Sequence, residues 1–228
     1  EAKTGGKLLA IPHNGNLSNG RMFEETTFTG GPMTKAYAES RQKWEPLFEL
    51  TQTKGQSESN PVLSPTDEFA SWDLWDRGNL NGAAKKPEML RTEYWREALK
   101  SGLRLEAALG VNPFKYGANA ATDTHTALAT GDEDNFWGKF VGAEPSATRW
   151  KPVMIGAGQP GQIYSWEQAA SGYTGVWATS NTRAAIWDAM KRRETFATTG
   201  PRMSVRFYGG YDFTEADTAD LVKAGYSK

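Results

Sequence analysis

Asp123 and His125 stand two residues apart after an extended-looking segment, and this spacing could place both side chains on one metal ion. If Tyr116–Ala121 is a β-strand whose direction continues, residues i and i+2 point to the same side. Carboxylate oxygen and imidazole nitrogen suit Zn, Mn or Fe, and an ion with an open coordination position makes a nucleophile from bound water. The alternative is structural: Asp123 caps a turn and His125 makes a local hydrogen bond.

Two further residues of this chemical kind belong to other apolar segments. His13 follows the apolar run Lys7–Ile11, which predicts a buried strand that ends in a turn. Glu49 lies among apolar neighbours in the predicted strand Pro46–Thr51, where a carboxylate is costly unless it is paired or binds a cation, so it is a candidate ligand or general base. His13 could instead be a structural histidine, and Glu49 could face water from an edge strand.

Two basic residues could hold the anionic part of a substrate. Lys54 opens a polar, turn-prone segment that follows the Glu49 strand, and Arg202 follows a predicted turn over Ala197–Pro201. An exposed arginine without a partner is the ordinary alternative for Arg202. Together with Glu49, these residues form the predicted catalytic set.

The elements that must position these residues alternate between strand and helix. The first half of the chain predicts a strand over Lys7–Ile11, a helix ending near Trp44, a strand over Pro46–Thr51, an amphipathic helix over Arg91–Leu109 broken near Gly102 and capped by Gly110, and a strand over Tyr116–Ala121. This order implies parallel strands joined by crossover connections. Parallel strands would deliver all four candidate ligands to one rim of an α/β sheet.

The remaining segments predict long irregular connections and a strand region near the C-terminus. The region between Pro61 and Pro87 carries Trp72 and Trp75 and is either a lid or a loop pinned by its aromatic side chains. A second loop is expected over Asp132–Trp150. The later elements expected are a helix over Arg183–Arg193, capped within Ser180-Asn181-Thr182, and a half-buried strand over Met203–Phe207.

Composition excludes several classes of protein. The 228 residues suffice for one main core, and the net charge of -1, from 26 basic and 27 acidic residues, marks no nucleic-acid surface. No apolar run approaches the roughly 20 residues of a membrane span. The chain has no cysteine, so any metal must use His, Asp and Glu. Small, anionic molecules are the expected partners.

Four stretches together resemble the DUF3604 family, which is similar to the polymerase and histidinol phosphatase (PHP) superfamily. The first stretch is Ile11 to Ser18, and the second is Phe48 to Leu50 followed by Lys54 to Glu58. The third is Ala121 to His125. The fourth begins at Val176 to Ala178 and ends with Arg192 to Arg202. The resemblance spans about Lys7 to Phe207, with the motifs in the right order. It implies that residues 1–228 form a single PHP-like domain.

The resemblance implies a distorted, barrel-like α/β fold with up to three divalent metals at its C-terminal rim, used in the superfamily for hydrolysis, often of phosphate esters. His13 resembles the histidine of a middle metal motif, Asp123 and His125 resemble the terminal D-x-H motif, and Glu49 matches the bridging carboxylate. Some relatives are exported, which is the only indication of a compartment.

The chain also departs from the superfamily pattern. No H-x-H pair occurs in it, and Lys54 stands where relatives carry a histidine. We therefore expect the chain to resemble the C-terminal part of a longer barrel. The leading hypothesis is a metal-dependent hydrolase that attacks a phosphate ester with a metal-bound hydroxide. The alternatives are a non-catalytic module, with a partial metal site and tryptophan-rich loops that bind a ligand such as a glycan, and a folding fragment with neither activity.

Overall fold

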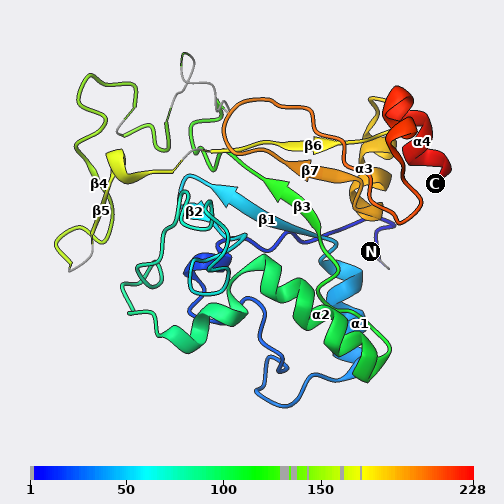
Figure 1. Cartoon of the computed structure of the whole chain (residues 1–228). Coiled ribbons are helices and arrows are strands. Elements are labelled where there is room, and N and C mark those ends of the chain that lie inside the picture. Colours follow the sequence, from blue (N-terminus) through cyan, green and yellow to red (C-terminus); the bar gives the residue numbers. More distant parts are fainter. Residues whose placement is uncertain (1–2, 129–133, 135–137, 143, 160–161, 170) are drawn as a thin grey trace.

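A small mixed sheet in the order β2-β1-β3 lies at the centre of the computed structural model, which describes residues 3–128, 134, 138–142, 144–159, 162–169 and 171–228 (Figure 1). β1 (Leu47–Gln52) pairs in parallel with β3 (Gly117–Ala120) and antiparallel with the short β2 (Gly55–Gln56). Every residue of β1 is buried. The parallel pairing confirms the predicted crossover between these two strands.

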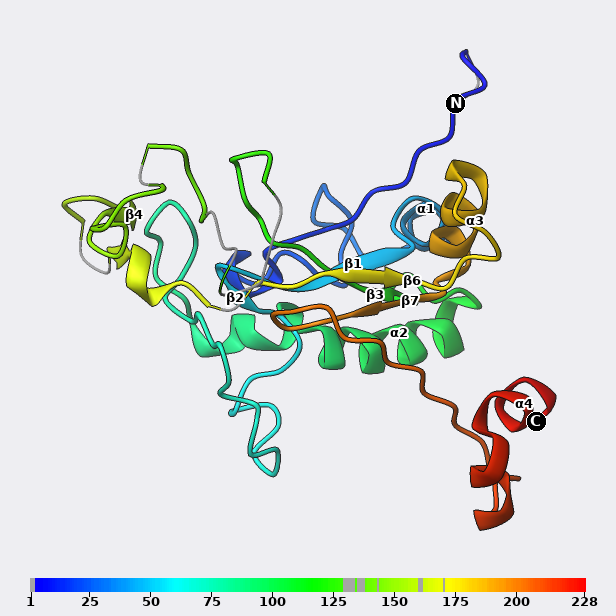
Figure 2. The same ribbon diagram turned by 90° about the horizontal axis from the view of Figure 1, so that it is seen from above.

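Helices cover both faces of this sheet. α2 (Trp95–Leu109) follows the 3-10 helix η2 (Pro87–Thr92) and lies on one face, whereas α1 (Lys35–Trp44) and α3 (Arg183–Arg192) lie on the other (Figure 2). All three were predicted, because each has an apolar stripe or a capping signal. The core packs α1 and α2 onto β1 through an aromatic cluster of Phe23, Phe48, Phe114 and Tyr116.

Helix α2 is continuous, so the predicted break near Gly102 is wrong. A Cβ atom at this position would lie 2.3 Å from Oδ1 of Asn112, which accepts a hydrogen bond from the N–H of Phe114 at 2.9 Å. The lack of a side chain at Gly102 therefore allows the chain that follows α2 to pack closely against the helix, and it does not mark a break. The predicted C-cap is confirmed, since Gly110 has a left-handed φ of 76°.

Two further sheets lie beside the centre. β6 (Thr174–Val176) and β7 (Thr195–Ala197) form an antiparallel pair, whose threonine hydroxyls donate to backbone carbonyls of β3 at 2.7 Å. β4 (Val153–Ile155) pairs with β5 (Ile163–Tyr164) at the left of Figure 1. The fold is mixed α/β as expected. Within the described residues, these small sheets do not close into a barrel.

Two predicted strands are absent from the described residues. Lys7–Ile11 is not a strand, although the Ala10 N–H donates to the Trp44 carbonyl at 2.6 Å, at the end of α1. Met203–Phe207 is irregular and exposed, with Phe207 88% exposed, because no element in the described part of the chain packs over its apolar side chains. β6 and β7 were missed because three-residue strands carry too little periodicity.

The remaining elements are short. They are the 3-10 helices η1 (Gly15–Leu17), η4 (Ser165–Glu167) and η5 (Glu215–Asp220) and the helix α4 (Leu221–Ser227). The region 62–86 is irregular before η2, as predicted, and residues 132, 133, 135–137 and 143 of the second predicted loop lie outside the described residues. No helix in the described part of the chain is long and apolar enough to cross a membrane.

Candidate functional site

The described structure brings four of the predicted site residues to one pocket of about 490 Å³. His13, Lys54, Asp123 and His125 line it, together with Lys139, which the sequence did not single out. They arrive on three connections: His13 from the segment before η1, Lys54 from the turn after β1, and Asp123, His125 and Lys139 from the segment that follows β3. The Glu49 N–H donates to the Pro12 carbonyl at 3.1 Å, which fixes His13 beside β1. Lys54 lies in the tight turn between β1 and β2.

Asp123 and His125 lie beyond the end of β3 and not on a strand. Asp123 has a left-handed φ of 51°, so the i and i+2 argument for a strand does not apply. The two side chains nevertheless face each other, with His125 Nε2 3.3 Å from Asp123 Oδ1. The His125 backbone N–H donates to the Lys139 carbonyl at 2.8 Å, which ties the two segments together.

Two ammonium groups converge on the carboxylate of Asp123. Lys54 and Lys139 both pair with its Oδ2, and Lys139 also donates to its backbone carbonyl at 2.6 Å. Both lysine side chains are buried, with exposed fractions of 9% and 5%. Burial would raise the pKa of Asp123, but hydrogen bonds from Lys139 and Lys54 outweigh it and lower that pKa.

Burial and the neighbouring charges also shift the pKa of Lys139. Burial lowers the pKa of its ammonium group to about 8, the carboxylate of Asp123 opposes this shift, and the positive charge of Lys54 adds to it. Lys139 also lies 3.1 Å from His125 Nε2. Near neutral pH, the region around Asp123 therefore holds more positive than negative charge.

Glu49 forms the second carboxylate of the site. It lies under His13, with Oε2 3.3 Å from the imidazole Nδ1. That oxygen is buried and has no hydrogen-bond partner of good geometry among the described residues. The contact with Glu49 raises the pKa of His13, although burial acts in the opposite direction.

Gln52 is a second residue that the sequence did not single out. Its Oε1 accepts from the backbone N–H of Lys54 at 2.8 Å and from Lys54 Nζ at 3.0 Å, while its Nε2 donates to Asn14 Oδ1. This fully buried amide therefore orients Lys54 toward Asp123. Its position at the end of a buried strand was the available signal, whereas Lys139 had none.

Arg202 does not line this pocket. Its guanidinium lies 5.5 Å from the ring centroid of Tyr173, and the residue is exposed. Among the predicted catalytic residues, the structure therefore groups Glu49 and Lys54 with the candidate ligands and leaves Arg202 outside the group.

The donor set suits a divalent ion in kind, since it offers two carboxylates and two imidazoles. The buried Oε2 of Glu49, without a good hydrogen-bond partner in the described part of the chain, is an available donor. The described residues contain no group of three His, Cys, Asp or Glu side chains placed to hold one ion. Binding at Asp123 therefore requires Lys54 and Lys139 to move away from its carboxylate.

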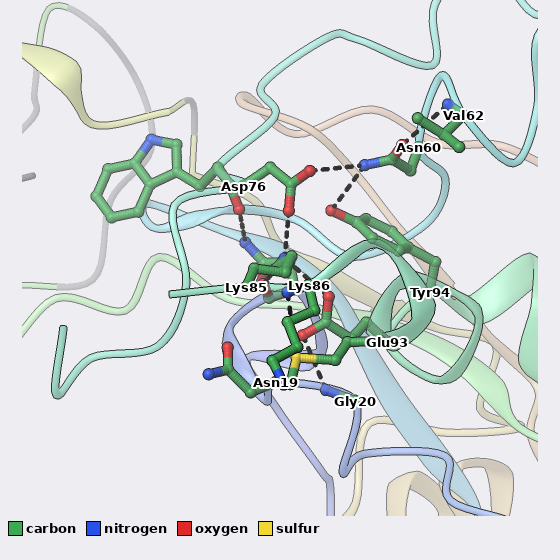
Figure 3. Close-up of polar contacts among 12 residues, drawn as sticks. Asn19, Gly20, Asn60, Val62, Asp76, Lys85, Lys86, Glu93 and Tyr94 are labelled. Carbon is green, nitrogen blue, oxygen red and sulfur yellow. Dashed lines mark hydrogen bonds and ion pairs between the residues drawn. The ribbon is translucent and has the colours of Figure 1, made fainter. Parts of the chain in front are cut away.

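A buried charge network holds the irregular segment that forms one wall of the pocket (Figure 3). Lys85 lies 2.8 Å from the fully buried carboxylate of Glu93, pairs with Asp76, and donates to the Asn16 carbonyl at 2.6 Å. Glu93 also accepts from the Gly20 N–H at 3.1 Å. The wall residues Trp75 and Leu80 therefore lie on a segment that is anchored at its base.

Comparison with known proteins gives one match. A family model described as "Protein of unknown function (DUF3604)" matches residues 1–228. No curated protein and no solved structure matches the chain.

Proposed function

Because this chain belongs to the DUF3604 family over residues 1–228, we propose that it is a metal-dependent hydrolase of anionic esters, most simply phosphate esters. The pocket lined by His13, Lys54 and Asp123 is the proposed active site. The observation that carries this proposal is the pair of buried ammonium groups on the single carboxylate of Asp123. Their excess positive charge favours a phosphoryl group over a neutral ligand.

Lys54 and Lys139 bind the phosphoryl oxygens in this proposal. An arriving anion competes with Asp123 for the two ammonium groups, so substrate binding weakens the ion pairs that hold the Asp123 carboxylate. Of the two carboxylate oxygens of Glu49, Oε2 is the donor available to an ion, and the other oxygen accepts a proton from the attacking water. Gln52 keeps Lys54 directed at the phosphoryl group.

The proposed metal ion, Zn, Mn or Fe, would be held by Glu49 with His13 and by Asp123 with His125. When bound, it supplies a hydroxide nucleophile near neutral pH and stabilises the charge that develops on the ester. Lys54 and Lys139, which pair with Asp123 in the metal-free protein, would leave that carboxylate to the ion and turn their ammonium groups to the phosphoryl oxygens. We further propose that β1, α2 and β3 form part of a PHP-like barrel.

Elemental analysis of the purified protein, together with an assay of hydrolysis, tests this proposal. We expect near-stoichiometric Zn, Mn or Fe and turnover of p-nitrophenyl phosphate or bis(p-nitrophenyl) phosphate. Both are lost in Asp123→Ala/His125→Ala. Asp217→Ala, which removes a carboxylate from the C-terminal segment, is the matched control and retains both. Equal metal content and turnover in the double variant would contradict the proposal, as would their absence from the wild-type protein.

A second candidate function rests on a different surface. Phe69 and Trp72 are exposed and line a hollow of about 350 Å³ with the polar side chains of Gln56, Ser59 and Asp67. Exposed aromatic faces beside hydrogen-bonding groups suit the binding of a glycan. Calorimetric titration with maltohexaose, cellohexaose and chitotetraose tests this alternative: it requires binding that Trp72→Ala abolishes, without turnover of any ester.

A further inference from the structure

A second pocket, also of about 490 Å³, adjoins the proposed active site. Leu80, Ile155 and Gly156 line both pockets, so they form the boundary between them. The remaining lining residues of the second pocket include Arg77, Asn79, Asn81 and Gln159. A ligand held at Lys54 and Lys139 could therefore extend across Leu80 into a separate space.

The chemistry of the second pocket differs from that of the first. Its charged group, Arg77, lies 2.5 Å from the carboxylate of Glu167, which compensates its positive charge. The amide side chains of Asn81 and Gln159 provide neutral donors and acceptors, whereas Oδ1 of Asn79 already accepts from the backbone N–H groups of Asn81 at 3.0 Å and Ala83 at 3.1 Å. A second anionic group of a ligand would gain little binding energy in such a pocket, because the charge of Arg77 is already compensated. Hydroxyl groups of a ligand could instead form hydrogen bonds with the amide side chains.

The wall between the pockets is preformed, because contacts within the protein hold it in place. Glu167 holds both sides of it, because its backbone carbonyl accepts from Trp75 Nε1 at 2.9 Å and its carboxylate pairs with Arg77. The same carboxylate accepts from the Tyr164 N–H at 2.9 Å, which fixes η4 to β5. Preformed walls reduce the ordering cost of binding.

The turn that carries Leu80 is fixed as well. The Asn79 N–H donates to the Ala83 carbonyl at 3.1 Å, and a Cβ atom at Gly78 would lie 2.1 Å from that oxygen. Gly78 has a φ of 103°, which residues other than glycine rarely adopt. Together with the anchor at Lys85, these contacts define the position of Leu80 at the pocket boundary.

We propose that the substrate has two parts: an anionic head bound by Lys54 and Lys139, and an uncharged arm rich in hydroxyl groups, such as a sugar, bound in the second pocket. This inference rests on the proposed function and specifies its substrate class. Asn81 and Gln159 contact the arm, whereas Leu80 and Ile155 pack against its apolar faces. The two parts are joined across the Leu80 boundary.

Calorimetric titration with ethyl phosphate and glucose 6-phosphate tests this inference, because the two share a head and differ in the arm. We expect glucose 6-phosphate to bind about ten-fold more tightly, the gain from one or two additional neutral hydrogen bonds. Asn81→Trp, which fills the second pocket from an exposed position, removes this preference and leaves the affinity for ethyl phosphate unchanged. Val62→Trp, at a 73% exposed position outside both pockets, retains the preference.

The possible failures are distinguishable. If the wild-type protein binds the two phosphates equally, or if the preference survives Asn81→Trp, the second pocket does not bind the arm and only this inference is overturned. If neither phosphate binds, the cationic site itself is wrong, and the proposed function fails together with the inference.

Discussion

The imidazole Nδ1 of His13 lies 3.3 Å from Oε2 of Glu49, a carboxylate that is only 6% exposed. The pair joins a connection near the N-terminus to the central strand β1. Because the contact stabilises the imidazolium form, a proton and a metal ion compete for the same two side chains. Acidic conditions therefore disfavour metal binding at this position.

We expect His13 in the metal-free protein to titrate above the ordinary histidine value of about 6.5. Glu49→Gln should lower that pKa, since it removes the negative charge. The contribution of the pair to stability is fully present below about pH 6.5 and is lost as the pH rises through the higher folded-state pKa. Nuclear magnetic resonance of the histidine ring protons measures both values, and a His13 midpoint below about 6.5 would contradict the assignment.

In the metal-free protein, Asp123→Asn should lower the free energy of unfolding by about 3 kcal/mol, since it leaves two buried ammonium groups without a counter-charge. Urea denaturation at pH 7 measures this loss. Asp217→Asn is the control, because it breaks an ion pair with Lys228 in the C-terminal segment and should leave stability almost unchanged. A similar midpoint for both variants would show that the lysines do not depend on Asp123.

Lys85→Met should destabilise the protein by about 3–5 kcal/mol, since it leaves the fully buried carboxylate of Glu93 unpaired. Burial already raises the pKa of Glu93, and Lys85 opposes that shift. Loss of Lys85 should therefore raise the pKa further and make the ionised carboxylate more costly to bury. The double variant Lys85→Met/Glu93→Gln should recover much of the loss. Faster hydrogen exchange over residues 73–86 in the single variant would locate the effect.

The matched control for Lys85 is Arg91→Met, which breaks a more exposed pair with Glu25. Its expected cost is no more than about 1 kcal/mol. Equal losses in Arg91→Met and Lys85→Met would mean that the network of Figure 3 does not anchor the pocket wall.

Gly102→Ala should destabilise the protein by about 1–3 kcal/mol despite the higher helix propensity of alanine. The new methyl group would lie 2.3 Å from Asn112 Oδ1 and displace the turn that follows α2. Gly142→Ala, where a Cβ atom meets no neighbour within 4 Å among the described residues, should change stability by no more than about 0.5 kcal/mol. Thermal unfolding of the two variants compares them, and a stabilised Gly102→Ala would contradict the packing argument.

Elements with a strong local signal were predictable from the sequence. The helices over Lys35–Trp44 and Arg183–Arg192 have side-chain caps at Thr34 and Thr182, and each hydroxyl accepts from a first-turn N–H. The alternation in Met203–Phe207 was misleading, because alternation produces a strand only when another element covers one face. Such coverage depends on tertiary packing, which a local pattern does not contain.

The site was predictable in its residue types but not in its charge balance. His13, Lys54, Asp123 and His125 belong to types that bind metals or anions, and parallel pairing of β1 and β3 helps explain their approach. Lys139 could not be anticipated, since a lysine in an irregular segment is usually solvated. It is buried here because the carboxylate and carbonyl of Asp123 both accept its donors.

The parallel register of β1 with β3 also joins two segments that lie far apart in the sequence. Leu47 pairs with Gly117, so the long intervening segment must close as a loop before the sheet forms. During synthesis, β1 emerges well before β3 and Lys139. A nascent chain that stops before Lys139 therefore carries Asp123 without the second of the two ammonium groups that pair with it.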